Sequence, residues 1–386
     1  MNSKKIVIKG KGTAGAQAIA HMAKWFPNCE LSWYYDPSIP TQTVGEGSVL
    51  TLGSNMFQNL NFSHEDIIKV DGTFKTGVYK EGWGASGKEF FHDFPPPLIS
   101  YHFNAVKLQD YIFNKLKDKV NIVEGNFDNK DIDADYIMDC SGKPKDLSKF
   151  NIPDYIPVNS VFVNQCLWEY PAFQHTKAIA RPYGWVFMIP LQNRCSVGYL
   201  YNNKINSIDD IKEDIQQVIK KYKLTPSEST NSFTFGNYVR KVNFEDRVVY
   251  NGNASFFLEP LEATSIGLMH YIQRLAFDLW SGNIDINFCN QSYLNFVSQT
   301  ENIIMMHYFA GSKYKSEFWD FAQERGEKCM KEAIQKDDYF KYMVNTSKQI
   351  SSLGDCNQYK EEEYSVWWLG SFLQNITGLD IKNKLK

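Results

Sequence analysis

Three glycines near the start of the chain have the spacing of a phosphate-binding loop. They are Gly10, Gly12 and Gly15, with Thr13 and Ala14 between the last two. Gly10 allows a sharp turn, Gly12 lets the backbone approach a pyrophosphate without a Cβ in the way, and Gly15 lets a helix pack close to a strand. A helix that follows would present free N–H groups and a partial positive charge to the phosphates. The spacing therefore predicts a dinucleotide site, with a glycine turn that binds nothing as the simpler alternative.

The segments around this loop have the order that a dinucleotide site needs. Residues 5–9 (KIVIK) form an apolar, β-branched run that predicts a strand, and residues 16–23 are good helix formers. A second strand is expected at residues 30–35, and Asp36 follows it. This carboxylate falls about 20 positions after the glycines, where an acceptor for a ribose hydroxyl belongs. The strand, the turn, the helix and Asp36 together favour a dinucleotide site over an ordinary turn.

Four further segments follow the loop, and their order is informative. They are residues 44–48 (VGEGS), 72–78 (GTFKTGV), 183–191 (YGWVFMIPL) and 257–268 (FLEPLEATSIGL). With the glycine loop, this set resembles the flavin-dependent halogenases of the tryptophan-halogenase family. The resemblance runs from residue 5 to about residue 320 and includes the Tyr101-His102-Phe103-Asn104 run. One such segment could occur by chance, whereas five in the right order are strong evidence for the resemblance.

The resemblance implies a fold and a chemistry. Members of this family have a Rossmann-like FAD-binding core of the flavin-monooxygenase type, and they receive reduced flavin (FADH2) from a separate flavin reductase. With O2, the reduced flavin oxidises a halide to hypohalous acid, which reaches a lysine near a small aromatic substrate. The expected cofactor is therefore FAD, with O2 and a halide as co-substrates. Shorter members include phage-encoded enzymes, and the Lys-, Asn- and Ile-rich composition is consistent with such an origin.

The resemblance also gives roles to individual residues. It makes Lys75 and Glu262 the catalytic residues, and it places the halide at the backbone amides of Thr264 and Ser265. The remaining matched positions surround the cofactor: Val44, Glu46 and Gly47 in a segment that straps over the flavin, Ile266 beside it, and Trp185, Phe187 and Pro190 in a wall of the flavin site.

The chemistry of halogenation is consistent with these roles. Free hypohalous acid is indiscriminate, so an amine such as Lys75 must hold it by a hydrogen bond or carry it as an N–halogen bond, and desolvation would assist either role. A carboxylate such as Glu262 can polarise the oxidant, stabilise the cationic ring and help remove its proton. Consecutive N–H groups after a turn suit a halide. The plainer alternatives are a solvated lysine, a structural carboxylate and, for Trp185 and Phe187, ordinary core aromatics.

The sequence departs from the family pattern at several positions. Phe187 replaces the second tryptophan of a W-x-W-x-I-P signature, while Ala263 and Ser265 stand where serine and glycine are frequent. If these changes enlarge the anion site, larger and more easily oxidised halides would be favoured. The region after Asp320 is brief, which predicts a more open substrate pocket. Glu262 favours the branch of the family that acts on indoles over the branch that acts on phenols.

Composition excludes several other functions. Of 386 residues, 43% are hydrophobic and 22% charged, as in an ordinary globular protein, and the net charge of −3 gives little support for nucleic-acid binding. The seven cysteines are scattered and form no C-x-x-C pair. This pattern predicts reduced thiols in a cytoplasm and no metal site. No run of about 18 apolar residues occurs, so no membrane span is expected.

The elements that must position these residues predict an α/β fold. We expect a Rossmann-like core, an inserted antiparallel sheet at about 71–100 and 155–201, and a helical C-terminal part. This divides the chain into an FAD-binding and halide-oxidising core at 1–280 and a helical substrate-pocket part at 281–386, fused as one unit. A homo-oligomer remains open. Two other functions also remain open: a flavin monooxygenase that hydroxylates an aromatic, and a non-catalytic FAD-binding module.

Overall fold

The computed structural model describes residues 3–40, 46–95, 98–350, 352, 354–359 and 362–385. Val44, which we expected in the flavin strap, lies outside these residues. Contacts within the chain group it into two compact units. The first unit comprises 1–72, 103–152 and 238–297, and the second comprises 73–102, 153–237 and 298–386. The division of the chain at residue 280 stays a prediction, and these two units are described separately.

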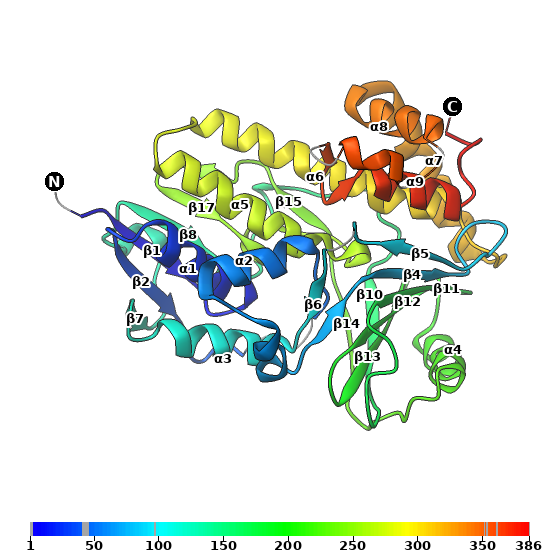
Figure 1. Cartoon of the computed structure of the whole chain (residues 1–386), viewed down its shortest axis with the longest axis horizontal. Helices are drawn as coiled ribbons and strands as arrows, with labels where there is room; N and C mark the ends of the chain where they lie inside the picture. Colours follow the sequence, from blue (N-terminus) through cyan, green and yellow to red (C-terminus); the bar gives the residue numbers. More distant parts are fainter. Residues whose placement is uncertain are drawn as a thin grey trace. The chain divides into compact units, whose positions relative to one another are not determined.

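A parallel sheet is the centre of the first unit (Figure 1). Its strands are β1 (Lys5–Lys9), β2 (Glu30–Tyr35), β7 (Asn121–Glu124), β8 (Tyr136–Asp139), β16 (Phe244–Glu245) and β17 (Val248–Tyr250). The order is β16-β17-β8-β1-β2-β7, and only β16 pairs with its neighbour antiparallel. Ile6, Val7 and Ile8 of β1 are all buried, as expected of a parallel strand that is covered on both faces. The expectation of a Rossmann-like core is confirmed.

Helices of the first unit gather around the helix that follows the glycine loop. This helix, α1 (Thr13–Trp25), packs against α2 (Leu50–Leu60), α3 (Ala105–Leu116) and α5 (Thr264–Trp280). The unit also contains η1 (His64–Val70), η2 (Asn129–Asp131), η3 (Gly252–Ala254), η4 (Leu261–Ala263) and a small sheet of β9 (Phe150–Asn151), β15 (Tyr238–Arg240) and β18 (Phe256–Phe257). Helix α6 (Ile286–Ala310) has residues in both units.

A seven-stranded sheet forms the main layer of the second unit. Its strands are β4 (Gly77–Glu81), β5 (Phe90–Asp93), β10 (Ser160–Leu167), β11 (Thr176–Arg181), β12 (Gly184–Pro190), β13 (Arg194–Tyr201) and β14 (Thr230–Thr234). The order is β14-β10-β13-β12-β11-β4-β5. The predicted insert is thus present, but it is mixed rather than wholly antiparallel, because β4 and β11 pair in parallel. This pair joins two segments from distant parts of the chain, which a hairpin pattern cannot reveal.

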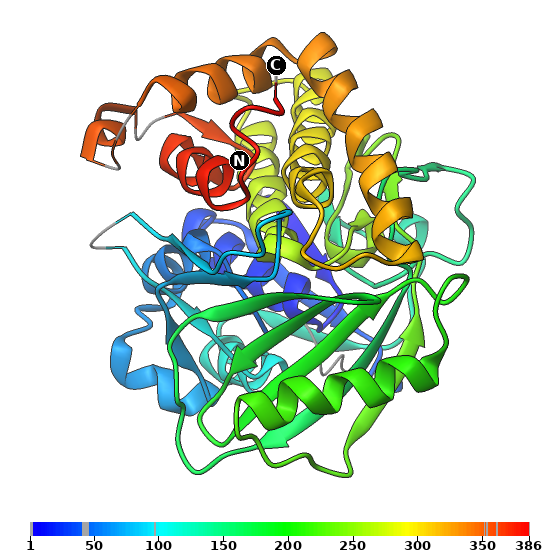
Figure 2. The ribbon, with the colours of Figure 1, turned by 90° about the vertical axis from the view of Figure 1, so that its right-hand side faces the viewer.

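One amphipathic helix covers a face of this sheet. Helix α4 (Ile208–Lys221) lies across the green strands in Figure 2. Its apolar side, which includes Ile211, Ile215 and Val218, packs against Val197 and Tyr199 of β13 in a shared core. Spacings of three and four residues between these side chains place them on one helix face.

The C-terminal residues of the second unit are mainly helical, as expected. They form α7 (Glu317–Lys336), α8 (Asp338–Gln349), η5 (Gly354–Tyr359) and α9 (Leu369–Gly378), with a short pair of strands, β19 (Glu363–Tyr364) and β20 (Trp367–Trp368). A second two-stranded sheet pairs β3 (Thr73–Lys75) with β6 (Ser100–His102). Among the residues that the structure describes, no helix has the length and apolarity needed to cross a bilayer.

Candidate functional site

The loop between β1 and α1 requires two of its three glycines for steric reasons. Gly10 has φ +108°, and a Cβ there would lie 2.4 Å from the carbonyl oxygen of Cys140. A Cβ on Gly15 would lie 1.9 Å from the carbonyl oxygen of Gly10. Both contacts are with backbone, which cannot rotate away. Gly12 differs, because a Cβ at that position would meet nothing within 4 Å.

This loop has the features needed to hold the pyrophosphate of a dinucleotide. Gly12 is the N-cap of α1 and contributes no side-chain cap, and a Cβ at this position would meet nothing within 4 Å. The free backbone amides and the helix dipole together favour the binding of an anion at the N-terminus of α1. Asp36 directly follows β2, and its Oδ1 accepts hydrogen bonds from Ser38 Oγ (2.6 Å) and Ser38 N (2.9 Å). These bonds hold the pKa of Asp36 below its usual value, so the carboxylate remains an acceptor.

The predicted flavin strap is described only from Glu46 onward. Glu46 and Ser48 are buried, and the carbonyl of Glu46 accepts a hydrogen bond of 3.2 Å from the amide of Phe103. This bond anchors the segment to the chain just before α3. Gly47 lies between the two buried residues, and α2 begins soon after them. The segment is therefore fixed within the first unit next to helices that pack on α1.

Glu262 and Ala263 form an unusual turn before α5. Their φ angles are +66° and +54°, although neither is glycine. A left-handed conformation in such residues costs about 1–3 kcal/mol and is often retained at functional sites. Ala263 is the N-cap of α5 and supplies no side-chain cap, so the amides of Thr264 and Ser265 begin the helix without one. Successive amides after such a turn make an anion-binding concavity.

Two side chains of this turn are buried. Glu262 is 8% exposed, which is unusual for a carboxylate. The hydroxyl of Thr264 is buried and has no hydrogen-bond partner among the described residues. A buried donor without an acceptor is costly, and an anion bound at the start of α5 would satisfy it. Ile266, in the first turn of the same helix, is also buried. The residues present therefore fit a halide.

Lys75 is buried on β3 of the second unit. Its side chain is 1% exposed, and Nζ lies 5.6 Å from the centre of the Phe94 ring. In the β3–β6 ladder, Lys75 pairs with Ser100. Lysine is almost never buried to this degree without a specific partner or role. The solvated-lysine alternative is therefore excluded for this residue.

The predicted aromatic wall lies on β12 of the second unit. Trp185 is buried, and its ring centre is 6.3 Å from that of Trp83 and 6.4 Å from that of Phe187. A Cβ on Gly198 would lie 2.1 Å from the Phe187 ring, so a glycine on the neighbouring strand makes room for this ring. The carbonyl of Pro190 accepts a hydrogen bond of 2.8 Å from Thr73.

The predicted residues thus fall into two sets. The first unit contains the residues predicted to bind flavin and halide, together with one catalytic residue: the glycine loop, Asp36, Glu46, Gly47, Glu262, Thr264, Ser265 and Ile266. The second unit contains the other catalytic residue and the predicted wall: Lys75, Trp185, Phe187 and Pro190. Sequence reasoning missed one buried polar cluster in the second unit. Lys80 is fully buried and donates to His307 Nε2 (2.6 Å) and to Asn375. No local signal marked Lys80, because a lysine in a strand is normally solvated.

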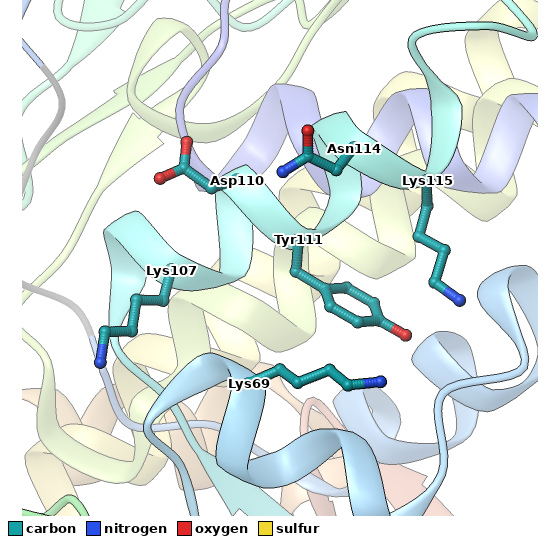
Figure 3. Close-up of a pocket in the computed structure, with 6 residues that line it drawn as sticks. All are labelled: Lys69, Lys107, Asp110, Tyr111, Asn114 and Lys115. Carbon is teal, nitrogen blue, oxygen red and sulfur yellow. The ribbon is translucent and has the colours of Figure 1, made fainter.

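A pocket of about 380 Å³ lies elsewhere in the first unit, between α3 and η1 (Figure 3). Its lining consists of Lys69, Lys107, Asp110, Tyr111, Asn114 and Lys115. Two of the lysines pair with nearby acids, Lys69 with Asp66 at 2.7 Å and Lys107 with Asp71 at 3.7 Å. The charge around this pocket is therefore balanced. Within the described residues no group of histidine, cysteine and acidic side chains could hold a metal ion.

Known proteins match this chain along most of its length. A family model described as "Tryptophan halogenase" matches residues 5–121 and 107–384. Tryptophan 7-halogenase RebH of Lentzea aerocolonigenes is 21% identical over 416 residues, which cover 82% of this chain and 78% of RebH. Tryptophan 6-halogenase SttH of Streptomyces toxytricini is 20% identical over 430 residues, covering 84% of this chain and 82% of SttH.

Solved structures share the fold along almost the whole chain. Xcc4156, a flavin-dependent halogenase from Xanthomonas campestris, superimposes with a TM-score of 0.81 at 18% identity, covering 99% of this chain and 90% of that one. The structure titled VirX1 apo superimposes with a TM-score of 0.75 at 15% identity, covering 99% and 92%. At these identities the structural likeness shows the fold.

Proposed function

This chain belongs to the tryptophan halogenase family, whose members are flavin-dependent enzymes that halogenate aromatic substrates, and from this premise we propose how its own residues do so. Reduced FAD, O2 and a halide yield hypohalous acid, which Lys75 and Glu262 direct to an electron-rich aromatic or indole-like substrate. The observation that carries the proposal is the strained turn at Glu262 and Ala263, which places the Thr264 and Ser265 amides and a buried hydroxyl at one end of α5.

The first unit supplies the flavin site in this proposal. Gly10, Gly12 and Gly15, with the amides of Thr13 and Ala14, hold the pyrophosphate, and Asp36 accepts a ribose hydroxyl. Glu46 and Gly47 belong to the strap over the flavin, and Ile266 lies beside it. When bound, the reduced flavin would supply the two electrons that reduce O2 to the peroxide level, and oxygen at this level would oxidise the halide to hypohalous acid. A separate flavin reductase provides it in reduced form.

The halide occupies the concavity at the start of α5. The amides of Thr264 and Ser265 donate to it, and the Thr264 hydroxyl, which is buried without a partner among the described residues, adds a third donor. Ala263 has a small side chain at this position, and a roomy site favours bromide and iodide over chloride. A competition between halides tests this preference, because clean chlorination from an equimolar mixture would contradict it.

Lys75 holds or carries the oxidised halogen. Either its ammonium donates a hydrogen bond to hypohalous acid, or its neutral amine forms an N–halogen bond and releases water. Burial favours both, because water no longer competes for the amine. The halogen then replaces a ring hydrogen, which leaves as a proton. Glu262, itself buried, is the group that accepts this proton and stabilises the cationic ring before it leaves.

Trp185, Phe187 and Pro190 wall off the flavin so that the organic substrate does not meet it directly. Trp185 is buried between aromatic neighbours, which suits a rigid wall. The substrate is a small aromatic compound. We place the reaction in the cytoplasm, and association into a homo-oligomer is compatible with it.

Replacement of Lys75 by alanine tests the proposal directly. The enzyme is supplied with reduced FAD, O2, bromide and an indole, and products are identified by mass spectrometry. We expect the wild type to give a brominated indole and Lys75→Ala to lose at least about 100-fold of this rate, since a positioning or general-acid contribution is of that order. Lys88→Ala, at an exposed lysine of the same unit, should retain full activity.

Other outcomes of the same assay separate the competing functions. A hydroxylated indole that persists in Lys75→Ala would indicate a flavin monooxygenase. Hydrogen peroxide as the sole product, with every aromatic compound and halide tried, would indicate an FAD-binding module without halogenating activity.

A further inference from the structure

We propose that His102 is a positioning residue for Lys75, an inference that rests on the role given to Lys75 above. His102 is fully buried on β6 of the second unit. Its Nδ1 lies 3.0 Å from Thr73 Oγ1, and its Nε2 lies 2.9 Å from Thr176 Oγ1. Thr73 Oγ1 in turn donates to the carbonyl of Pro190 over 2.8 Å. A histidine, two threonines and one carbonyl thus form a continuous chain of hydrogen bonds, which is buried except at the half-buried Thr176.

The direction of every bond in this chain can be assigned. A threonine hydroxyl has one proton, and the carbonyl of Pro190 can only accept it. Thr73 Oγ1 must therefore accept from His102, so Nδ1 of His102 carries a hydrogen. Nε2 of the neutral ring then has a free lone pair, and Thr176 donates to it. Only one tautomer satisfies all three bonds.

The surroundings keep His102 neutral. Burial, and then the nearby charges of Lys75 and His175, lower the pKa of His102 well below its usual value, although a hydrogen bond from the ring to the Phe74 backbone acts in the opposite direction. Protonation would place a second N–H on the ring, which the hydroxyl of Thr176 would then have to accept. The assigned tautomer is therefore maintained across the pH range in which the enzyme would work.

Two members of this chain, Thr73 and His102, lie on the same face of the β3–β6 ladder as Lys75. Side chains two residues apart on a strand point to the same face, so Thr73 and Lys75 share a face of β3. On β6, Ser100 pairs with Lys75 and His102 pairs with Thr73. Thr73, Lys75, Ser100 and His102 are all buried. The amine and the imidazole therefore belong to one polar layer of this ladder.

The β3–β6 ladder needs an external support. A two-stranded sheet alone is marginally stable. Thr73 connects the ladder to the end of β12, and His102 connects it to Thr176 at the start of β11. Both of these strands belong to the seven-stranded sheet. Lys75 follows Thr73 by two residues, so these bonds determine where its amine lies relative to the sheet that carries Trp185, Phe187 and Pro190.

Two pairs of variants test the inference. His102→Leu removes both ring hydrogen bonds, whereas His102→Asn keeps an amide donor near the place of Nδ1. Thr73→Val removes the hydroxyl with little change of shape, whereas Thr73→Ser keeps it. Each protein receives reduced FAD, O2, bromide, its aromatic substrate and a small dione in solution, which traps escaped hypobromous acid. The two brominated products are measured together, and Tm is recorded for each protein.

A displaced Lys75 amine should release the oxidant instead of delivering it. We expect His102→Leu and Thr73→Val to lower bromination of the aromatic substrate by about 10- to 100-fold, while total bromination, dione included, stays near the wild-type value. The ratio of brominated aromatic substrate to brominated dione should return most of the way to the wild-type value in Thr73→Ser and part of the way in His102→Asn. An unchanged partition in well-folded His102→Leu and Thr73→Val would overturn the inference, and so would an equal fall of both products.

The same assay distinguishes this inference from the proposed function. The role of Lys75 itself is wrong if the wild type brominates neither the aromatic substrate nor the dione. It is also wrong if Lys75→Ala gives the same ratio of the two brominated products as the wild type. A measurement without turnover is also available. Nitrogen-15 NMR of histidine-labelled protein, assigned with His102→Asn, should show a hydrogen on Nδ1 of His102 and none on Nε2. The opposite tautomer would contradict the inference independently of any activity.

Discussion

At the scale of single residues, the turn at Glu262 and Ala263 combines conformational strain with burial. Two adjacent residues with side chains adopt left-handed conformations, and the carboxylate of the first is buried. Neither feature improves stability, since each costs free energy in an ordinary protein. Their combination directly before the first amides of α5 is what a preorganised anion site needs. Strain at this place thus supports the role proposed for Thr264 and Ser265.

The strain at Ala263 can be tested by substitution. Ala263→Gly should raise the free energy of unfolding by up to about 1 kcal/mol, because glycine adopts φ +54° without a Cβ penalty although its unfolded chain is more flexible. Ala263→Val should lower it by about 2 kcal/mol, since a branched side chain tolerates this region poorly. Urea titrations measure both. A less stable Ala263→Gly would show that the conformation is not strained.

Lys75 and Lys80 show how little a residue type says by itself. Both are lysines on neighbouring short strands and both are almost completely buried. Lys75 faces the ring of Phe94, whereas Lys80 donates to His307 and Asn375 and lies near the rings of Phe90 and Trp367. The sequence motif selected the first and overlooked the second. Only their surroundings show that Lys80 connects β4 to α6 and α9 in the second unit.

At the scale of elements, the junction of β1 and α1 was the most predictable part of the chain. The order of strand, glycine turn and helix depends on local backbone geometry. A Cβ on Gly10 or Gly15 would overlap backbone atoms, so these two positions require glycine. Helix α4 was equally predictable, since its apolar residues recur with helical spacing. The parallel pairing of β4 with β11 was not, because it joins segments about 100 positions apart and leaves no local signature.

Two glycine substitutions separate folding from flavin binding at this junction. Gly15→Ala should destabilise the protein by about 2 kcal/mol, because its Cβ would lie 1.9 Å from a backbone oxygen. Gly12→Ala should leave Tm nearly unchanged, because its Cβ meets open space, yet should weaken FAD binding at least about tenfold by occupying the place of a phosphate. Thermal melts and flavin titrations measure the two effects. Full flavin affinity in Gly12→Ala would place the pyrophosphate elsewhere.

At the scale of the whole molecule, the chain passes between its two units several times. Residues 73–102 and 153–237 leave the first unit and join the C-terminal helices in the second. The residues proposed for flavin and halide therefore come from one unit, and the proposed halogen-carrying lysine comes from the other. The stability of the molecule is a property of both units, and one half-buried acid of the second unit should make this stability depend on pH.

Glu301 on α6 should make the protein less stable as pH rises toward neutrality. Burial, and then the charges of Asp154 and Glu332, raise the pKa of Glu301 from 4.5 to about 7. The folded state therefore binds this proton more tightly than the unfolded state. The stabilisation is complete below about pH 4.5, is lost as pH rises to about 7, and is on the order of 3 kcal/mol.

Calorimetric melts between pH 4.5 and 8 test this dependence. Glu301→Gln, which stays neutral, should be more stable than the wild type at pH 8 and show a flatter change of Tm with pH. Glu327→Gln, at an exposed glutamate of α7, should follow the wild type. If Glu301→Gln and the wild type melt in parallel over the whole range, the carboxyl is ionised in both states and the raised pKa is wrong.

The sequence by itself determined the glycine loop, the Rossmann-like core, the family and the candidate residues, because each depends on local backbone geometry or on short motifs. The tertiary structure decided the rest through contacts between distant segments. It buried Lys75 against Phe94, strained the backbone at Glu262 and Ala263, and made His102 the centre of a hydrogen-bond chain. Forming such contacts costs loop-closure entropy because the contacting segments are far apart in the chain, and a short stretch of sequence therefore does not predict them. The chemistry proposed for Lys75 begins with a motif and depends on these contacts for its position.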